Sequence, residues 1–304
     1  MEVRGDWKMM GDIFRFPRHN TTSGICWRCK TTPATMREFD SAASWRRDDM
    51  KLSHWDLLQR IVQLGKKPST LMGAPGLTVS MFLFDWLHAA DLGMTGNFLG
   101  NVMWLLLAKQ AGCRNQSQRC QALYLKMLAY YKAEGVIDKL PRLTELMIRK
   151  KSTACPKLRA SASEARHLVK FIMQETANCF SDHDPIELAV KKAAVHLHSC
   201  YECLSHDKFQ ADVLKDNCIR FCTLYKTLEE KVPGNYWKIK PKMHLFAELC
   251  SSGANPSIWW TYRDEDFGGL IATLCRRRGG AYTATSMALA TLHKFRAKNT
   301  PYLK

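Results

Sequence analysis

The chain has 304 residues, of which 46% are hydrophobic, so it can bury the core of one large domain or two smaller ones. Lys and Arg number 45 against 28 Asp and Glu, and this net charge of +17 favours a polyanionic partner, above all DNA, although basic chains also arise from biased genomes or bind acidic proteins. No apolar run approaches the roughly 20 residues of a membrane span, and the N-terminus lacks the apolar segment of a secretory signal. We therefore expect no membrane association, no secretion, and a location in the nucleus or elsewhere inside the cell. In such a reducing compartment the 12 cysteines stay free or bind metal.

Helical patterns dominate the chain. Residues 1–36 predict an irregular segment, followed up to residue 65 by one or two amphipathic helices. The run TVSMFLFD, residues 78–85, is the best strand candidate. A capping box at Ser161 and Glu164 predicts a helix start. Further helical patterns cover residues 96–110, 123–130, 190–204, 214–228 and 267–274, so we expect a mainly α chain with a small β component.

An acidic cluster opens the last helical pattern, where Asp264, Glu265 and Asp266 precede Phe267. Acids in the first turn interact favourably with the helix dipole, which is the simpler interpretation. The other interpretation is a catalytic corner, because two-metal phosphodiester chemistry needs several carboxylates that converge on ions about 4 Å apart.

Four segments follow one another in the order known from a transposase family. They are GDWKMMGDIFRFPRHNTTSGICWRC, FDWLHAADLGMTGNFLGNVMW, KIKPKMHLFAEL and WWTYRDEDFGGLI, spread over residues 5–271. The chain resembles the C-terminal part of CACTA-type and related eukaryotic DDE/D cut-and-paste transposases. Each motif is weak alone, and their order carries the resemblance.

The resemblance implies a partial ribonuclease-H-like core with few strands and a large all-helical insertion. Residues 1–36 would hold a residual core strand and the Cys-x-x-Cys loop, residues 37–258 the insertion, and residues 259–304 the terminal core helices. Asp6 and Glu265 match the second and last catalytic acids, which in that family hold two Mg²⁺ or Mn²⁺ ions. Asp85 and Asp91 are conceivable replacements for the first acid.

Because only five residues precede Asp6, we expect the first aspartate and most of the sheet to be missing, and the catalyst of this chain to be incomplete. A homo-oligomer or a separate N-terminal region would then have to complete it.

The pair Cys26 and Cys29 gives a separate metal hypothesis. Two thiolates at this spacing bind one tetrahedral Zn²⁺ when two further ligands join them, and the alternative is two buried thiols. The resemblance favours His88 as third ligand, with His19, His54 or Asp85 as fourth. Two other groups have simpler interpretations than metal binding. We expect His244 to be a core residue or to support a ligand, and we expect Cys200 and Cys203 to be core residues.

Basic clusters are the third feature. Lys240 and Lys242 lie in the segment YWKIKPKMH, which mixes cations with aromatic residues, and Arg276, Arg277 and Arg278 follow the acidic cluster. Such clusters bind nucleic acid or form a solvated surface. Two functions follow: a transposon-derived DNA-binding protein that would be a Mg²⁺-dependent strand transferase if complete, or a non-enzymatic helical module that binds nucleic acid or protein.

Overall fold

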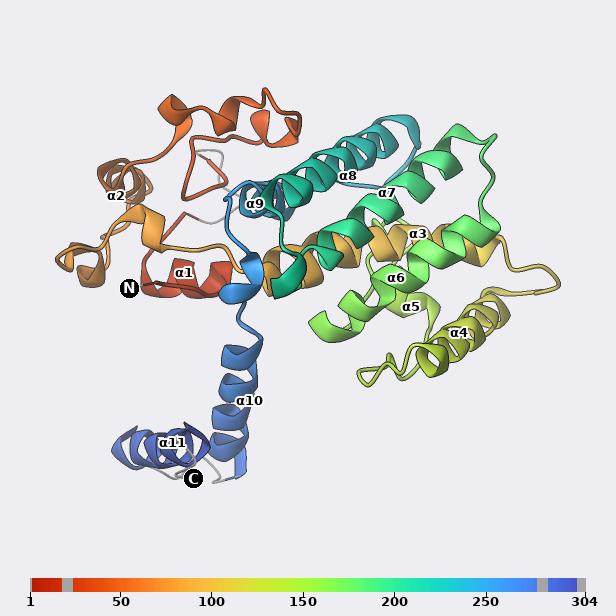
Figure 1. The fold of residues 1–304 in the computed structure, drawn as a ribbon. Coiled ribbons are helices and arrows are strands. Elements are labelled where there is room, and N and C mark those ends of the chain that lie inside the picture. The colour runs from red at the N-terminus through yellow and green to blue at the C-terminus, as the bar shows by residue number, and fades with distance from the viewer. Residues whose placement is uncertain (1, 18–23, 278–283, 300–304) are drawn as a thin grey trace. The chain divides into compact units, whose positions relative to one another are not determined.

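The computed structural model describes residues 2–17, 24–277 and 284–299, and the chain divides into two compact units, Met1–Trp260 and Thr261–Lys304 (Figure 1). Within the described residues the fold is almost entirely helical. No β-strand is present there, and β-type pairing is limited to two isolated bridges, Val3 with Phe82 and Cys29 with Lys51. The mainly α expectation is confirmed, whereas the described residues contain no ribonuclease-H-like sheet.

The first unit contains nine α-helices and one π-helix among its described residues. The α-helices are α1 (Trp7–Ile13), α2 (His54–Gln63), α3 (Gly96–Ala108), α4 (Gln116–Ala133), α5 (Glu145–Ile148), α6 (Ala162–Cys179), α7 (Pro185–Glu202), α8 (Ala211–Lys231) and α9 (Pro241–Cys250). The π-helix η6 (Leu87–Thr95) leads directly into α3. Short 3₁₀ turns are η1 (Thr35–Arg37), η2 (Ser44–Arg46), η3 (Asp48–Met50), η4 (Thr70–Gly73), η5 (Val79–Met81), η7 (His206–Lys208) and η8 (Pro256–Ile258).

Side-chain caps define several helix starts. Ser161 accepts a hydrogen bond from the Glu164 amide, and the Glu164 carboxylate accepts one from the Ser161 amide, so the predicted capping box is confirmed. At the start of α7 the Asp184 side chain accepts hydrogen bonds from the Ile186 and Glu187 amides, and Pro185 at the first position lacks the N–H that would otherwise be unpaired.

The predicted strand over residues 78–85 is wrong. Residues Val79–Met81 form a 3₁₀ turn, and Phe82 makes only one parallel bridge, to Val3. Phe82 and Phe84 are instead buried in an aromatic cluster that includes Trp27. Packing of the aromatic rings therefore orders this segment. Among the described residues no second backbone segment pairs with it to form a β-sheet.

The core of the first unit lies between packed helices. α7 packs against α6 and α8, and α9 packs against α8 and η6 (Figure 1). The first part of α3, from Gly96 to Met103, is buried all round, as its apolar residues on every side of the helix predict. Among the helices that the structure describes, none is both long and apolar enough to cross a membrane.

The second unit contains α10 (Tyr262–Arg277) and α11 (Ala284–Asn299). Helix α10 carries Asp264 and Glu265 in its first turn, so the predicted helix start beside the acidic cluster is confirmed.

Candidate metal centre

The loop around Cys26 and Cys29 is folded so that both thiols face inward. The amide of Arg28 donates to Cys26 Sγ at 3.2 Å, and the amide of Ile25 donates to the Thr31 carbonyl at 3.2 Å. Both thiols are at most 2% exposed. The loop therefore presents two sulfur atoms to the interior.

The loop is docked from two sides. Arg60 on α2 donates to the Cys26 carbonyl at 2.9 Å. The bridge between Cys29 and Lys51 is formed by two amide hydrogen bonds, from Lys30 to Met50 and from Leu52 to Arg28. These contacts fix the thiols before any metal binds.

Helix α9 supplies the opposite side of the site. His244 and Glu248 are four residues apart, so both side chains lie on one face of the helix. Cys26 Sγ donates to Glu248 Oε2 at 3.0 Å, and Cys29 Sγ lies 3.3 Å from His244 Nε2. Two segments more than two hundred residues apart thus meet at one point.

The four residues form the metal-competent group of the described chain. One ligand atom from each of Cys26, Cys29, His244 and Glu248 lies within 4.8 Å of all the others, and all four residues are buried. Two thiolates, one imidazole and one carboxylate suit a tetrahedral ion such as Zn²⁺, because zinc takes sulfur, nitrogen and oxygen ligands. The site can therefore hold a metal ion.

Burial and the neighbouring ligands shift the pKa values of the groups in the site. Burial raises the pKa of the Cys26 thiol and of the Glu248 carboxyl. Hydrogen bonds from Cys26, and also from His244 and Thr31, lower the pKa of the Cys29 thiol. A cation favours the deprotonated form of such ligands, so metal binding would release protons from the site.

Two contacts support the ligands. Lys51 Nζ lies 3.6 Å from Glu248 Oε1, the oxygen that points away from the thiols. The ring of Trp45 meets the His244 ring edge to face, with centroids 5.0 Å apart. His244 Nδ1 is buried and finds no hydrogen-bond partner among the residues that the structure describes, so packing orients this ring in place of the acceptor that usually supports a metal-bound histidine.

The structure places His244 and Glu248 beside the two thiols, where the sequence predicts His88 and a fourth residue. His88 Nδ1 pairs with Asp85 Oδ2, because Asp85 caps the start of η6 and holds the ring beside it. His54 Nε2 lies 3.0 Å from the Met72 carbonyl, and His19 lies outside the described residues. The missed signal is the spacing of two ligand-type residues four apart in MHLFAEL.

The two acids that the resemblance predicted as catalytic lie at helix starts in different units. Asp6 is the N-cap of α1, and its side chain accepts from the Met9 amide at 2.6 Å. Glu265 is exposed in the first turn of α10. Capping accounts for the position of Asp6 and the helix dipole for that of Glu265.

Asp6 has a carboxylate counterpart within its own unit. The parallel bridge joins Val3 to Phe82, and Asp6 and Asp85 each follow their paired residue by three positions. The pKa of Lys242 responds to both carboxylates, which raise it against the lowering effect of burial. The two acids therefore share a cationic neighbour.

The expected basic residues differ in environment. Lys240 Nζ donates to Asn97 Oδ1 at 2.7 Å, and Lys242 lies in the first turn of α9. Arg276 is exposed and donates to the Ala272 carbonyl at 3.3 Å. The side chain of Arg277 and the whole of Arg278 lie outside the described residues.

A third lysine, which sequence reasoning missed, joins Lys240 and Lys242. Lys157 Nζ donates to the Leu92 carbonyl at 2.8 Å. Burial and then repulsion by Lys242 and Lys240 lower the pKa of Lys157 to about 8. No local sequence pattern links residue 157 to residues 240–242, because the three meet only where η6 passes into α3.

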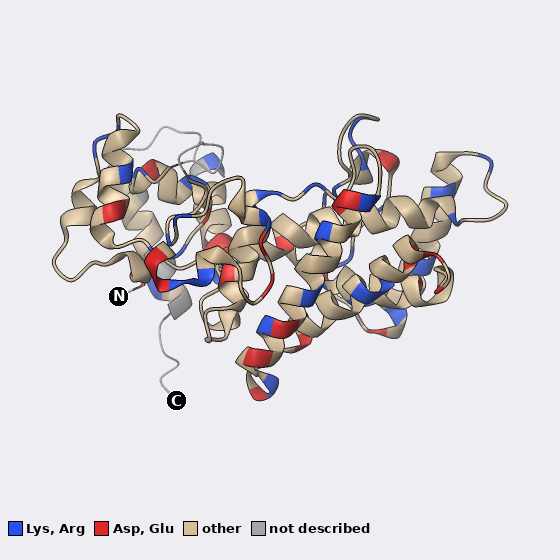
Figure 2. Cartoon of the chain, turned by 90° about the horizontal axis from the view of Figure 1, so that it is seen from above, with Lys and Arg blue, Asp and Glu red and all other residues tan. Residues whose placement is uncertain are grey.

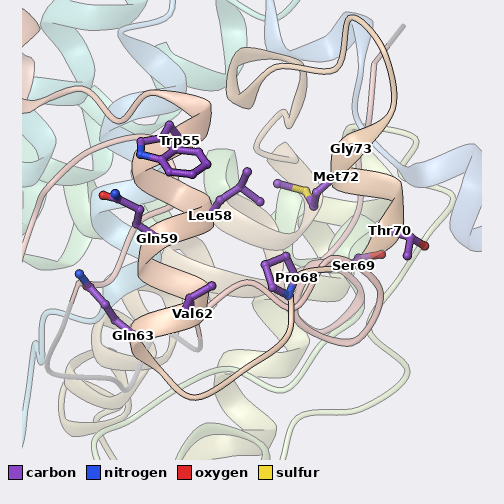
Figure 3. Close-up of a pocket in the computed structure, with 10 residues that line it drawn as sticks. All are labelled: Trp55, Leu58, Gln59, Val62, Gln63, Pro68, Ser69, Thr70, Met72 and Gly73. Carbon is purple, nitrogen blue, oxygen red and sulfur yellow. The ribbon is translucent and has the colours of Figure 1, made fainter.

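A pocket of about 620 Å³ lies on the outer face of α2 (Figure 3). Trp55, Leu58, Val62, Pro68 and Met72 line it, together with glutamine and hydroxyl side chains. None of its lining residues is acidic, basic, histidine or cysteine. The pocket therefore offers neither a metal ligand nor a general acid or base.

Comparisons of the chain with protein-family models, with curated proteins and with solved structures gave no match. The interpretation of the site accordingly depends on its own geometry.

Proposed function

We propose that the protein binds nucleic acid through the phosphate backbone without cleaving it, and that a structural zinc ion at Cys26, Cys29, His244 and Glu248 holds its binding surface in shape. The observation that carries the proposal is the cluster of Lys157, Lys240 and Lys242. The other Lys and Arg residues that the structure describes are distributed over many helices and loops (Figure 2), so we base the proposal on this cluster.

The lysine cluster is held by the fold. The Lys157 backbone crosses α3 at Gly100, where an added Cβ would lie 2.4 Å from Lys157 Cα. The stem of Lys242 lies over Gly93, where a Cβ would be 2.9 Å from Lys242 Cδ. Glycine at these positions lets two lysines approach the backbone of η6 and α3.

Gathering three ammonium groups in a partly buried place is unfavourable without an anion. Within the described chain the Lys242 ammonium group makes no hydrogen bond or ion pair, although Asp6 and Asp85 raise its pKa. Lysine is a compact point charge that suits phosphate oxygens. A nucleic-acid phosphate would therefore offset the repulsion within the cluster.

The metal centre supports a structural role for zinc. Four protein ligands leave no open position for water or substrate, as in structural zinc sites. Two thiolates, the Glu248 carboxylate and Zn²⁺ together carry one net negative charge, and the positive charge of Lys51 balances it. The ion would join the N-terminal loop to α9, whose first turn carries Lys242.

Salt-dependent binding of a labelled DNA duplex and a labelled single strand tests the proposal. The logarithm of the binding constant falls linearly with the logarithm of the salt concentration, and each lost phosphate contact makes this slope shallower by about 0.9 for a duplex. We expect the Lys157→Met, Lys240→Met and Lys242→Met triple variant to bind more weakly and with a smaller slope. Lys139→Met, at an exposed position whose side chain makes no hydrogen bond or ion pair with the described residues, is the matched control. Equal slopes for all proteins, or no binding at low salt, would contradict the proposal.

A second candidate function is metal-dependent DNA cleavage by a transposase-derived chain. The equal spacing of Asp6 and Asp85 from the Val3–Phe82 bridge favours it, since carboxylates after neighbouring parallel segments are a common way to gather metal ligands. Lys242 argues against it, because an ammonium group beside both acids competes with a metal ion.

Nicking of supercoiled DNA in Mg²⁺ or Mn²⁺ separates the two candidates. Asp6→Asn and Asp85→Asn keep an oxygen for the helix cap and remove the charge. Nicking by the wild-type chain that is lost in both variants and in Glu265→Ala would support catalysis. Absence of metal-dependent nicking, or equal nicking by all of the proteins, would leave binding as the function.

A further inference from the structure

Two basic segments that are distant in the sequence meet on α3. Residues 149–159 contain five Lys and Arg, residues 235–242 contain three Lys, and neither segment contains Asp or Glu. The buried side chain of Asn101 joins them, because its Oδ1 accepts from the Trp237 amide at 3.1 Å and its Nδ2 donates to the Pro156 carbonyl at 3.2 Å. The fold therefore brings together two segments whose charged side chains are all positive.

A stack of two aromatic rings and one guanidinium group lies where these segments meet. Arg149 Cζ lies 4.8 Å from the ring centroid of Tyr236 and 5.1 Å from that of Trp104, so the guanidinium group contacts both rings. All three side chains are half-buried, so the ring stack keeps a surface towards solvent. Among the described residues, no carboxylate forms an ion pair with Arg149.

Hydrogen bonds hold the ring stack in place. Arg149 Nη1 donates to Tyr236 Oη at 2.9 Å, and Arg149 Nε donates to the Ala154 carbonyl at 2.8 Å. The side chain of Asn235 donates to the Thr153 carbonyl at 2.6 Å and so ties the two segments together a second time. A ligand would therefore meet a surface that is already ordered, which lowers the entropic cost of binding.

The ring stack and the lysine cluster lie along one face of α3. Asn97, which accepts from Lys240, is followed by Asn101 and Trp104 at the four- and seven-residue spacing of a single helix face. Asn97 and Trp104 are two helical turns apart, which is about 10 Å. About three phosphates of one strand, spaced about 3.4 Å apart, span that distance.

We propose that this surface binds single-stranded nucleic acid, with an unpaired base on the ring stack and the neighbouring phosphates on the lysine cluster. The positive charge alone suits any polyanion, whereas aromatic rings and an arginine plane add a preference for a ligand with exposed π faces. The bases of a duplex are stacked on one another and do not offer those faces. The inference rests on the proposed function and specifies which form of nucleic acid is bound.

Binding of a labelled oligothymidine strand and of an abasic strand of the same length tests the inference, because both strands carry the same phosphates. We expect the wild-type chain to bind the thymidine strand about 10-fold more tightly, as one stacked base would provide. The salt dependence should be the same for both strands, since the number of phosphate contacts does not change. Equal affinity for the two strands would overturn this inference and leave phosphate binding in place, whereas no binding of either strand at low salt would overturn the proposed function as well.

Variants of Tyr236 assign the effect to the ring stack. Tyr236→Leu should reduce affinity for the thymidine strand about 10-fold with an unchanged salt slope, and Tyr236→Phe, which keeps the ring, should retain the preference. Tyr124→Leu is the matched control, because Tyr124 is a half-buried tyrosine of α4 whose hydroxyl donates to the Pro141 carbonyl at 2.7 Å. Trp104→Leu takes the place of Tyr236→Leu if that variant does not fold. A folded leucine variant that keeps the wild-type preference for the thymidine strand would overturn the site.

Discussion

His244 Nε2 lies 3.8 Å from Glu248 Oε2, so two ligand atoms from one face of α9 point to the same place. The loop thiols of Cys26 and Cys29 complete the group from the other end of the first unit. Helix α9 therefore carries two groups of residues: the candidate metal ligands on its inner face and Lys242 in its first turn. Binding of metal and order of the basic cluster should therefore be linked.

Loss of the thiol ligands should remove the metal and destabilise the first unit. We expect purified wild-type chain to contain one zinc ion, and Cys26→Ser with Cys29→Ser to contain none and to unfold at a lower temperature. The reason is that the free energy of binding a structural ion is also free energy of folding. Elemental analysis and thermal unfolding measure both effects. Cys113→Ser, at a half-buried thiol outside the site, is the control, and equal zinc and equal melting in both variants would contradict the assignment.

Replacement of Glu248 should separate its role as ligand from its role in packing. Glu248→His substitutes one zinc ligand for another and should retain zinc, whereas Glu248→Leu fills similar space and should lose affinity. A zinc-chelator competition measures the difference. If the leucine variant holds zinc as tightly as the histidine variant, Glu248 is not a ligand.

Gly100 should tolerate no side chain. Its added Cβ would lie 2.4 to 2.5 Å from backbone atoms of Lys157 and Leu158, which cannot move aside as a flexible side chain could. We expect Gly100→Ala to destabilise the first unit by about 2 kcal/mol or more, although alanine is the better helix former. Gly11→Ala in α1, where the nearest atom would be 3.8 Å away, should be neutral or stabilising in the same denaturation experiment. Equal stability of the two variants would contradict the close crossing.

The pKa of Lys157 makes part of the stability depend on pH. Because the folded-state pKa of Lys157, about 8, lies below the ordinary lysine pKa of 10.5, the unfolded chain binds more protons between these values. The destabilising effect of this charge is therefore complete below pH 8 and is relieved as pH rises towards 10.5. Lys157→Met should gain stability relative to wild type near pH 7 and lose that advantage near pH 10. A stability difference that does not change over this range would show that Lys157 has an ordinary pKa.

Patterns within one segment were predictable, and contacts between distant segments were not. The capping box at Ser161 and the buried helix after Gly96 follow from local spacing and were confirmed. The spacing of Cys26 and Cys29 likewise predicts either a metal-binding pair or two buried thiols, and the structure places both in a buried group that could hold a metal ion. The partner residues His244 and Glu248 depend on how α9 docks on the loop, and the four-residue spacing that marks them is also common in ordinary helices.

The strand prediction failed for a related reason. The β-branched and aromatic residues of TVSMFLFD fit a strand locally, but a strand needs neighbours, and only Val3 pairs with it. Lys157 was missed because its charge is unusual only beside Lys240 and Lys242, which the fold alone brings together.

X-ray absorption at the zinc edge of the purified full chain tests the central claim most directly. We predict one zinc ion per chain with two sulfur ligands near 2.3 Å and two nitrogen or oxygen ligands near 2.0 to 2.2 Å. Glu248→Leu should then lose one of the light ligands, and His88→Ala should leave the spectrum unchanged. A shell of four sulfur atoms, a shell without sulfur, or a spectrum that changes with His88 would contradict it.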